Sequence, residues 1–262
     1  MMRDDLFRDL HQTPGETIDP TRAARVSMRG PLPKRFYETA AVEARDGGFA
    51  LVLDGKPAKT PARNPLVLPT RASGEAVAQE WAAQGEHVDP ATMPLTRITN
   101  SAIDGVAGQI EAVRDEIVKY AGSDLVCYRA DAPDRLILAQ AKAWNPVLAF
   151  ARERLGAVFA LSEGVVFVEQ PAGAIETVRA RVAQETSPYR LAALHVITTL
   201  SGSALIALAL ADGGLDAEAA WAAAHVDEHY NESVWGEDLE ASRRRAIRAA
   251  DFMAAARLYA LT

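Results

Sequence analysis

The fold is decided by residues 191–211, whose sequence is LAALHVITTLSGSALIALALA. This length would suit a single membrane-spanning helix. However, the stretch contains His195 and several Thr and Ser residues, and its flanks are acidic and Gly-rich rather than basic. A helix that is apolar on every side is also typical of the centre of a helical domain. We therefore predict a pair of buried core helices that is broken at Ser201-Gly202.

Helical periodicity continues on both sides of this pair. Thr70 is a candidate N-cap for a helix that ends at Gly85. Apolar residues from Val106 to Tyr120 are spaced by three and four positions, which predicts a helix that ends at Gly122. Pro146 interrupts the next pattern, either as a kink or as the first residue of a new helix. The helices expected beyond residue 122 cover 136–155, 172–185, 188–210, 216–233 and 239–260.

A small β unit is expected upstream of Pro69. Two strands are predicted, at 36–43 and 49–53, and they are separated by the turn residues Asp46-Gly47-Gly48. Asp54-Gly55 is a second turn signal, after which the chain can return as an edge strand from Lys56. Farther along the chain, apolar runs at 158–161 and 165–168 flank Ser162-Glu163-Gly164, which predicts a short hairpin.

The sequence thus predicts an α+β protein with two domains. Residues 34–125 form a small antiparallel β-containing domain with one or two helices. Residues 126–262 form a larger, mostly α-helical domain with a short hairpin near 158–168. Residues 1–33 contain scattered Pro, Gly and charged residues without a sustained period, which favours a flexible N-terminal arm.

Composition narrows the class of function. The 262 residues include 28 Lys and Arg against 35 Asp and Glu, a net charge of −7, which disfavours nucleic-acid binding. The aromatic share of 6% indicates a core packed mainly with Ala, Leu and Val. The single cysteine, Cys127, excludes an internal disulfide and a multi-cysteine metal site, and we expect it to be a small buried hydrophobe. The charged N-terminus does not resemble a secretory signal, so we expect a cytoplasmic protein.

One motif points to an enzyme. His225-Val226-Asp227-Glu228-His229 matches the H-x-x-E-H order of inverted zinc peptidases, and its two histidines would lie on one helix face. The third zinc ligand is missing, because the carboxylates that follow have the wrong spacing. No Gly-rich phosphate loop, nucleophile elbow or acid/base pair is present. A zinc-dependent peptidase is therefore the alternative function, and we expect no catalytic residue, cofactor or metal.

The segment that starts at Trp235 is the candidate binding site. It continues with Gly236, Glu237, Asp238, Leu239 and Glu240 and is followed by an Arg-rich run. One interpretation is a well-capped, solvated helix in which Glu240 pairs with Arg244 at i+4. The other is a partner-binding edge anchored by Trp235, because Trp and Arg are enriched at binding hot spots.

Several stretches together resemble the assembly chaperone of the F-type ATP synthase catalytic head, the family that binds the alpha subunit. The order of these stretches along the chain carries the resemblance, which covers about residue 35 to the end. They are 53–61, Glu80-Trp81, 93–97, 100–104, 120–128, 144–146, 187–191, 201–203 and Trp235-Gly236.

The resemblance implies a non-enzymatic chaperone that binds the free alpha subunit and prevents its aggregation before the hexamer is assembled. It implies a β-containing N-terminal domain joined to a helical C-terminal domain. Eukaryotic members act in the mitochondrial matrix, whereas the acidic start of this chain suggests a cytoplasmic bacterial member. The resemblance associates the acidic start of the last helix with function, and the best matching position is Glu240, followed by Glu237 and Asp238. Together with the Trp235 anchor inferred above, these are the candidate partner-binding residues. Neither a nucleic acid, a membrane nor a small-molecule substrate is expected as a partner, although a small-ligand sensor is a further, weaker interpretation.

Overall fold

The computed structural model describes residues 32–164 and 166–262. These residues form two compact units, which divide between Gln109 and Ile110, and the last two residues of the chain belong to the first unit. The small sheet in the first unit and the helical second unit confirm the predicted α+β, two-domain class. The division lies upstream of the predicted boundary at 125–126, so that boundary falls inside the second unit. Most of the expected N-terminal arm, 1–33, lies outside the described residues.

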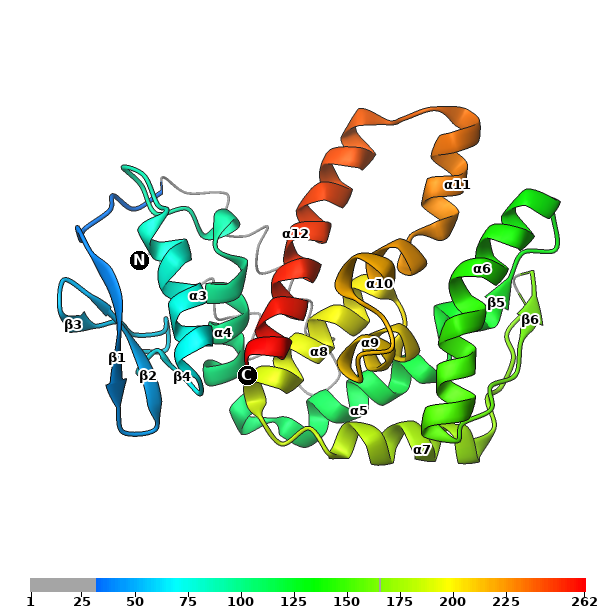
Figure 1. The fold of residues 1–262 in the computed structure, drawn as a ribbon, viewed down its shortest axis with the longest axis horizontal. Helices are drawn as coiled ribbons and strands as arrows, with labels where there is room; N and C mark the ends of the chain where they lie inside the picture. The colour runs from blue at the N-terminus through cyan, green and yellow to red at the C-terminus, as the bar shows by residue number, and fades with distance from the viewer. Residues whose placement is uncertain (1–31, 165) are drawn as a thin grey trace. The chain divides into compact units, whose positions relative to one another are not determined.

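The sheet of the first unit is built around β2 (Gly48–Leu53). This strand pairs antiparallel with β1 (Ala40–Arg45), and on its other edge with the short strands β3 (Lys56–Pro57) and β4 (Val67–Leu68) (Figure 1). The predicted strand 49–53 and the edge strand from Lys56 are confirmed.

The first strand begins at Ala40, four residues later than predicted, because polar side chains engage the backbone before it. Arg35 donates to the carbonyl oxygens of Tyr37 and Glu38, at 2.9 and 2.8 Å. The carboxylate of Asp54 accepts the amides of Glu38 and Thr39, at 3.0 and 2.8 Å. These backbone groups are therefore already bonded and do not extend the ladder.

Two α-helices follow the sheet in the described part of the first unit. Thr70 caps α3 (Arg71–Ala82) as predicted, in a capping box with Ser73, and α3 packs on β1 and β2. The sequence patterns missed α4 (Pro94–Asp104), which has no capping side chain of its own at its start. Instead, Glu80 of α3 accepts the amides of Leu95 and Thr96, at 2.7 and 2.8 Å. Two short 3-10 turns, η2 (Pro90–Thr92) and η3 (Val106–Gly108), flank α4.

The centre of the second unit is the predicted helix pair, α8 (Pro188–Ser201) and α9 (Ala204–Ala211). The chain breaks between them at Gly202, where φ is +69°, and Ser203 caps α9. Most side chains of both helices are buried, which confirms a core pair. In the described part of the chain, no helix is long and apolar enough to cross a membrane.

Asp124 ties the segment before residue 128 to this core. Its carboxylate is fully buried and accepts the Ser203 hydroxyl at 2.5 Å and the Leu205 amide at 3.0 Å. It therefore caps α9 from outside the helix. Cys127 follows in the 3-10 turn η4 (Leu125–Cys127) and is buried as expected, and desolvation raises the pKa of its thiol to about 12.

The other helices surround the pair, and their bounds refine the predictions. Pro146 lies inside α6. After α6 the chain continues as a π-helical segment, which Gly156 terminates with a φ of +76°. The expected helix 216–233 is instead two helices, separated at His225. The elements are α5 (Ile110–Ala121), α6 (Asp134–Phe150), the π segment (Ala151–Leu155), α7 (Ala172–Ala183), α10 (Ala217–Ala224), α11 (Val226–Trp235) and α12 (Leu239–Leu261).

The expected hairpin near 158–168 does not form as a pair of strands. The strand found there, β6 (Ser162–Glu163), pairs in parallel with β5 (Tyr128–Arg129). In the described residues no backbone ladder joins 157–161 to 166–170. The side chain of Gln170 instead accepts the Ala160 amide at 2.9 Å and donates to its carbonyl oxygen at 3.0 Å.

The buried Asp124 predicts a measurable pH dependence. Desolvation raises its pKa from 3.8 to about 6, so between these values the folded protein binds more protons than the unfolded chain. This carboxyl therefore lowers stability as pH rises through that range. Relative to Asp124→Asn, which does not titrate, we expect the wild type to gain roughly 2 to 3 kcal/mol on going from pH 6.5 to 4.

Urea unfolding of both proteins across this range measures the difference. His195, whose pKa burial lowers to about 4, titrates in both proteins and cancels from the comparison. Parallel stability curves for the two proteins would contradict the assignment.

Candidate functional site

The most exposed helical segment of the second unit is the α11–α12 hairpin, defined here as residues 226–248. None of the residues of α11 is buried, and the first part of α12 is equally open. The chain turns between the helices at Gly236, where φ is +88°. Figure 1 shows the turn at the far end of both helices from α10 and from the C-terminal end of α12.

An ion pair holds the two helices of the hairpin together. Arg245 of α12 lies 2.6 Å from Glu232 of α11, and Ser242 donates a hydrogen bond to the same carboxylate at 3.3 Å. The bond from Arg245 is the main reason that the pKa of Glu232 is lowered. Sequence periodicity missed this contact, because the two residues lie on different helices. These described contacts between α11 and α12 are polar.

Of the predicted site residues, Asp238 has a structural task. Its carboxylate accepts the amides of Ala241 and Glu240, at 3.2 and 2.9 Å, and these two bonds lower its pKa. Asp238 is therefore the N-cap of α12.

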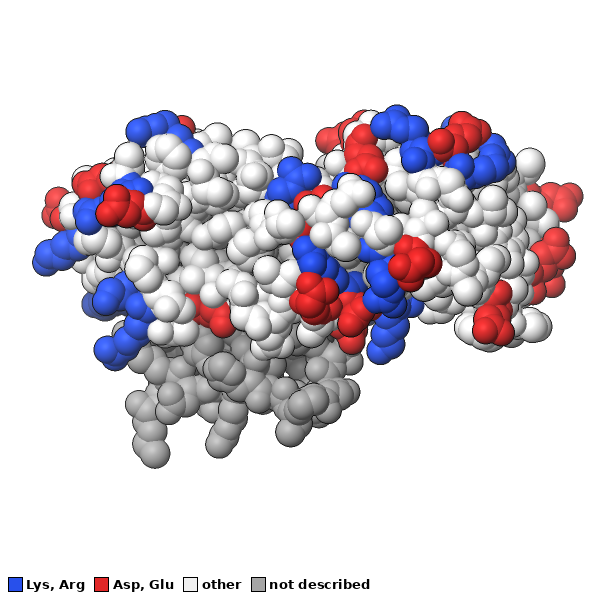
Figure 2. All heavy atoms as spheres, turned by 90° about the horizontal axis from the view of Figure 1, so that it is seen from below, with Lys and Arg blue, Asp and Glu red and all other residues white. Residues whose placement is uncertain are grey.

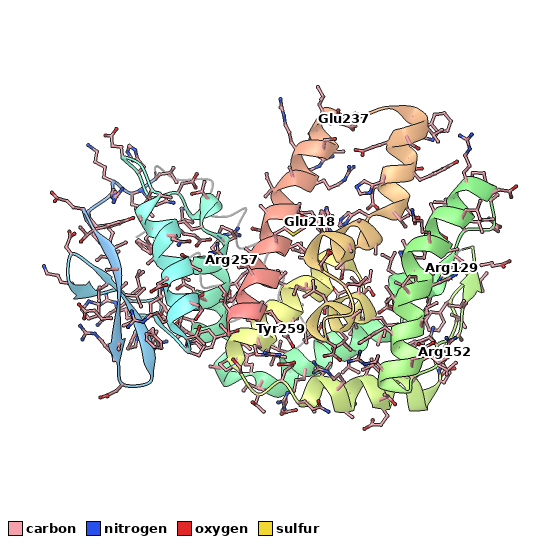
Figure 3. The ribbon with its side chains drawn as sticks, in the orientation of Figure 1. Arg129, Arg152, Glu218, Glu237, Arg257 and Tyr259 are labelled. Atoms are coloured by element: carbon pink, nitrogen blue, oxygen red, sulfur yellow. The ribbon has the colours of Figure 1, made fainter. Side chains whose placement is uncertain are left out.

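The other predicted site residues are open to a partner. Trp235 ends α11 with 83% of its surface exposed. Glu240 is also exposed and pairs with Arg244 at 2.6 Å, as the helical spacing predicts. Glu237 makes no hydrogen bond or ion pair with any described residue, and Figure 3 places it at the turn of the hairpin. It is therefore the acidic residue of the turn whose charge is uncompensated.

Three further apolar side chains accompany Trp235 on this hairpin. Val234, Leu239 and Ile247 are all exposed, and the first two immediately flank the turn in sequence. Sequence reasoning selected Trp235 alone, although its apolar neighbours at 234 and 239 were a signal that could have been used. Exposed apolar groups beside charged ones are typical of a protein-binding surface.

The H-x-x-E-H motif does not build a metal centre. His225 separates α10 from α11, so the two histidines do not lie within one continuous helix as expected. Its ring is buried against Trp221, with centroids 3.7 Å apart, and Nδ1 lies 3.0 Å from the carbonyl oxygen of that residue. Within residues 32–164 and 166–262, no group of three or more His, Cys, Asp and Glu could hold a metal ion.

A second group of charges lies at the base of α12. Burial alone would raise the pKa of Glu185, but hydrogen bonds from Arg190, Tyr259 and Arg181 outweigh that effect and lower it. Arg181 also pairs with Asp212. The cavity beside them, of about 680 Å³, is lined in part by Arg181, Glu185 and Arg190, whose charges already pair with one another or with Asp212. On the face shown in Figure 2, basic and acidic side chains likewise stand beside one another.

Comparison with known proteins identifies the family. Residues 34–152 match the model of the ATP12 chaperone protein family. A crystal structure of an Agrobacterium tumefaciens protein proposed to be a chaperone is 45% identical to the chain. It covers 99% of this chain and 96% of its own length, with a TM-score of 0.86. The chain belongs to the ATP12 chaperone family. The predicted resemblance is therefore confirmed.

Two further structures agree. Atp12 from Paracoccus denitrificans is 41% identical over 88% of this chain and 98% of its own, with a TM-score of 0.82. An aspartate-to-lysine mutant of the Atp12p of P. denitrificans is 40% identical over 87% and 97%, with a TM-score of 0.81. Membership in the ATP12 family supports a chaperone role in ATP synthase assembly and implies a subunit of that enzyme as the partner.

The assignment of Asp238 as a cap is testable with a pair of variants. Asp238→Ala removes the acceptor for the amides of Glu240 and Ala241, so we expect these amides to exchange hydrogen severalfold faster and the first turn of α12 to fray. Glu237→Ala, one residue earlier, removes a carboxylate that bonds to no described residue and should leave exchange unchanged. Equal exchange in Asp238→Ala and the wild type would refute the cap.

Proposed function

We propose that this protein binds the free alpha subunit of the F-type ATP synthase catalytic head and prevents its aggregation before hexamer assembly. We further propose that it acts in the bacterial cytoplasm and catalyses no reaction. The observation that carries the proposal is membership in the ATP12 family together with an exposed hairpin that presents apolar and acidic groups.

The chemistry of the hairpin fits a transient chaperone. A subunit that has not yet assembled exposes apolar interface, which favours aggregation. The chaperone must cover this surface and later release it when another subunit binds more tightly, since discrimination is a difference of affinities. A contact made by one large aromatic side chain with a charged rim suits a complex of moderate size and lifetime.

Each residue of the turn has a different proposed role in binding the alpha subunit. Trp235 supplies an apolar anchor at the end of α11, and Leu239 extends it on α12. Glu237 offers an uncompensated charge that can pair with a basic group of the alpha subunit. Glu240 offers a second carboxylate that can exchange Arg244 for a partner. Asp238 contributes indirectly, since it fixes the start of α12 and hence the direction of its neighbours.

Purified protein should suppress aggregation of the free alpha subunit at a one-to-one ratio and without ATP. Light scattering of the alpha subunit on dilution from denaturant measures the effect, with an unrelated acidic protein of similar size as the control. Undiminished scattering at equimolar protein, or failure to recover the alpha subunit in a pull-down, would refute the proposal.

Charge reversal on the hairpin should weaken this complex. We expect Glu237→Lys and Glu240→Lys each to raise the dissociation constant at least tenfold, and Trp235→Ala to raise it about thirtyfold, as for an interface hot spot. Glu218→Lys is a matched control, because Glu218 is also an exposed acid in a first helical turn.

Circular dichroism separates binding from folding in these variants. We expect all of them to keep the helical signal of the wild type, since each altered side chain is exposed. If Glu218→Lys weakens binding as much as Glu237→Lys, the loss of affinity results from the change in net charge, and the hairpin is not the contact site.

A further inference from the structure

The outer edge of β1 is an open edge of the sheet in the first unit. Among the described strands β1 pairs only with β2, and its six residues keep a regular antiparallel register from Ala40 to Arg45. The other side of β2 is shared by the two-residue strands β3 and β4. β1 is therefore the longest edge strand of the described sheet.

The outward backbone groups of β1 all lie on one side. Arg45 and Gly48 flank a two-residue turn and lie opposite each other, so they form a hydrogen-bonded pair of the ladder. Such pairs recur at every second residue, so the odd-numbered residues of β1 bond to β2. In agreement, the carbonyl oxygen of Thr39 accepts the Asp54 amide at 3.1 Å. The residues whose amides and carbonyl groups point away from β2 are Ala40, Val42 and Ala44.

These three positions are free to bind a further strand. In residues 32–164 and 166–262, no hydrogen bond engages the outward groups of Ala40, Val42 or Ala44. Proteins usually protect an edge with Pro, Lys or a bulge, and β1 has none of these. Its charged side chains, Glu43 and Arg45, pair with each other at 2.7 Å. The edge is therefore a template of three amides and three carbonyl groups on one unbroken strand.

The two faces of β1 determine which side chains an added strand would carry. Val42 lies against Gly74 of α3, so the even-numbered side chains face that helix. Ala40 and Val42 are only half-buried there, which leaves apolar surface for a neighbouring strand to cover. Glu43 and Arg45 are exposed on the other face. The complementary strand has apolar residues on the α3 side, and on the other face a basic residue opposite Glu43 and an acidic one opposite Arg45.

A second copy of the chain does not complement this edge. In the two-fold antiparallel register that pairs all three free positions, Glu43 lies opposite Ala41 of the other copy and Arg45 opposite Thr39. A register that places Glu43 opposite Arg45 of the other copy keeps only Ala44 of the free positions within the paired strands. A second copy thus satisfies either the charges or the backbone, whereas a client segment of suitable sequence satisfies both.

We infer that the outer edge of β1 binds an extended segment of the client chain as an added antiparallel strand. The segment alternates apolar residues with charged ones in the complementary order. Backbone hydrogen bonds supply affinity in this mode of binding, and alternate side chains supply selectivity. The inference deepens the proposed function and rests on it for the identity of the client. It gives the first unit a part in binding, in addition to the α11–α12 hairpin of the second unit.

The first arm of the experiment uses the full-length protein and a blocked peptide of sequence Glu-Val-Lys-Val-Thr-Val. Antiparallel to β1, its lysine lies opposite Glu43 and its glutamate opposite Arg45. At saturating peptide, we expect hydrogen exchange of the Ala40, Val42 and Ala44 amides to slow at least tenfold. The amides of residues 41 and 43 already bond to β2 and should change little.

Methylation of single peptide amides tests the geometry on the wild-type protein. The amide of the fourth peptide residue faces β1, so its N-methylation should weaken binding at least tenfold. The amide of the third residue faces away from β1, so its N-methylation is the matched control and should weaken binding less than threefold. An equal effect of the two methyl groups would overturn the inference.

A variant tests the edge itself. Ala44→Pro removes an outward amide at an exposed edge position, where proline is tolerated, and should weaken peptide binding at least tenfold with an unchanged melting temperature. Ala44→Ser keeps the amide and is the control. Equal binding by these two variants would overturn the inference. If Ala44→Pro unfolds, the methylated peptides decide.

In the second arm the probe is the free alpha subunit. Protection of the Ala40, Val42 and Ala44 amides in its complex supports both proposals. A complex in which they exchange freely overturns the inference and leaves the chaperone function standing. Protection by the peptide without any alpha-subunit complex supports the edge and contradicts the proposed function. Protection that increases with protein concentration alone assigns the edge to a second copy and overturns the inference.

Discussion

Burial of the α8–α9 pair is the constraint on which the second unit depends. Because most side chains of the pair are buried, both helices need cover on several sides, and α5, α6 and α10 supply it. The break at Gly202 would leave backbone amides of α9 unpaired inside this core, which is costly. Ser203 and Asp124 satisfy those amides. A carboxylate distant in sequence thereby fixes how the core helices are joined to the segment before them.

The α11–α12 hairpin, in contrast, buries few of its side chains. No apolar core covers it, and its helices are joined by the pair between Glu232 and Arg245. Because polar side chains join the two helices, Trp235 and Leu239 remain exposed to solvent. Monomeric proteins seldom leave such groups exposed without a use. Val166 and Phe167 are also exposed on the second unit. The second unit thus combines a closed core with exposed apolar side chains.

Much of this fold follows from local sequence. The helices that begin at Arg71, Pro188 and Leu239 were predictable, since each has a cap or a strong apolar pattern within it. In contrast, α4 was missed because its cap, Glu80, belongs to another helix. The prediction of a hairpin at 158–168 was wrong, because two apolar runs around a turn do not specify which strand each run will pair with. The strand found there, β6, pairs with β5.

The sequence singles out residues 235–240 as a candidate site but does not distinguish the roles of its acidic residues. Glu237, Asp238 and Glu240 are equivalent acids in the sequence, whereas the structure gives them different tasks. Hydrogen bonds make Asp238 a cap, an ion pair engages Glu240, and Glu237 is left without a partner among the described residues. Such differences depend on backbone geometry at the turn, which periodicity does not encode.

We propose that the protein holds the alpha subunit only until another subunit of the catalytic head replaces it. The most direct measurement is size-exclusion chromatography with light scattering on a mixture of the protein and purified alpha subunit, before and after addition of beta subunit. We expect a one-to-one complex that disappears when the beta subunit is added, with the chaperone recovered free. An alpha complex that persists beside excess beta, or no complex at all, would contradict it.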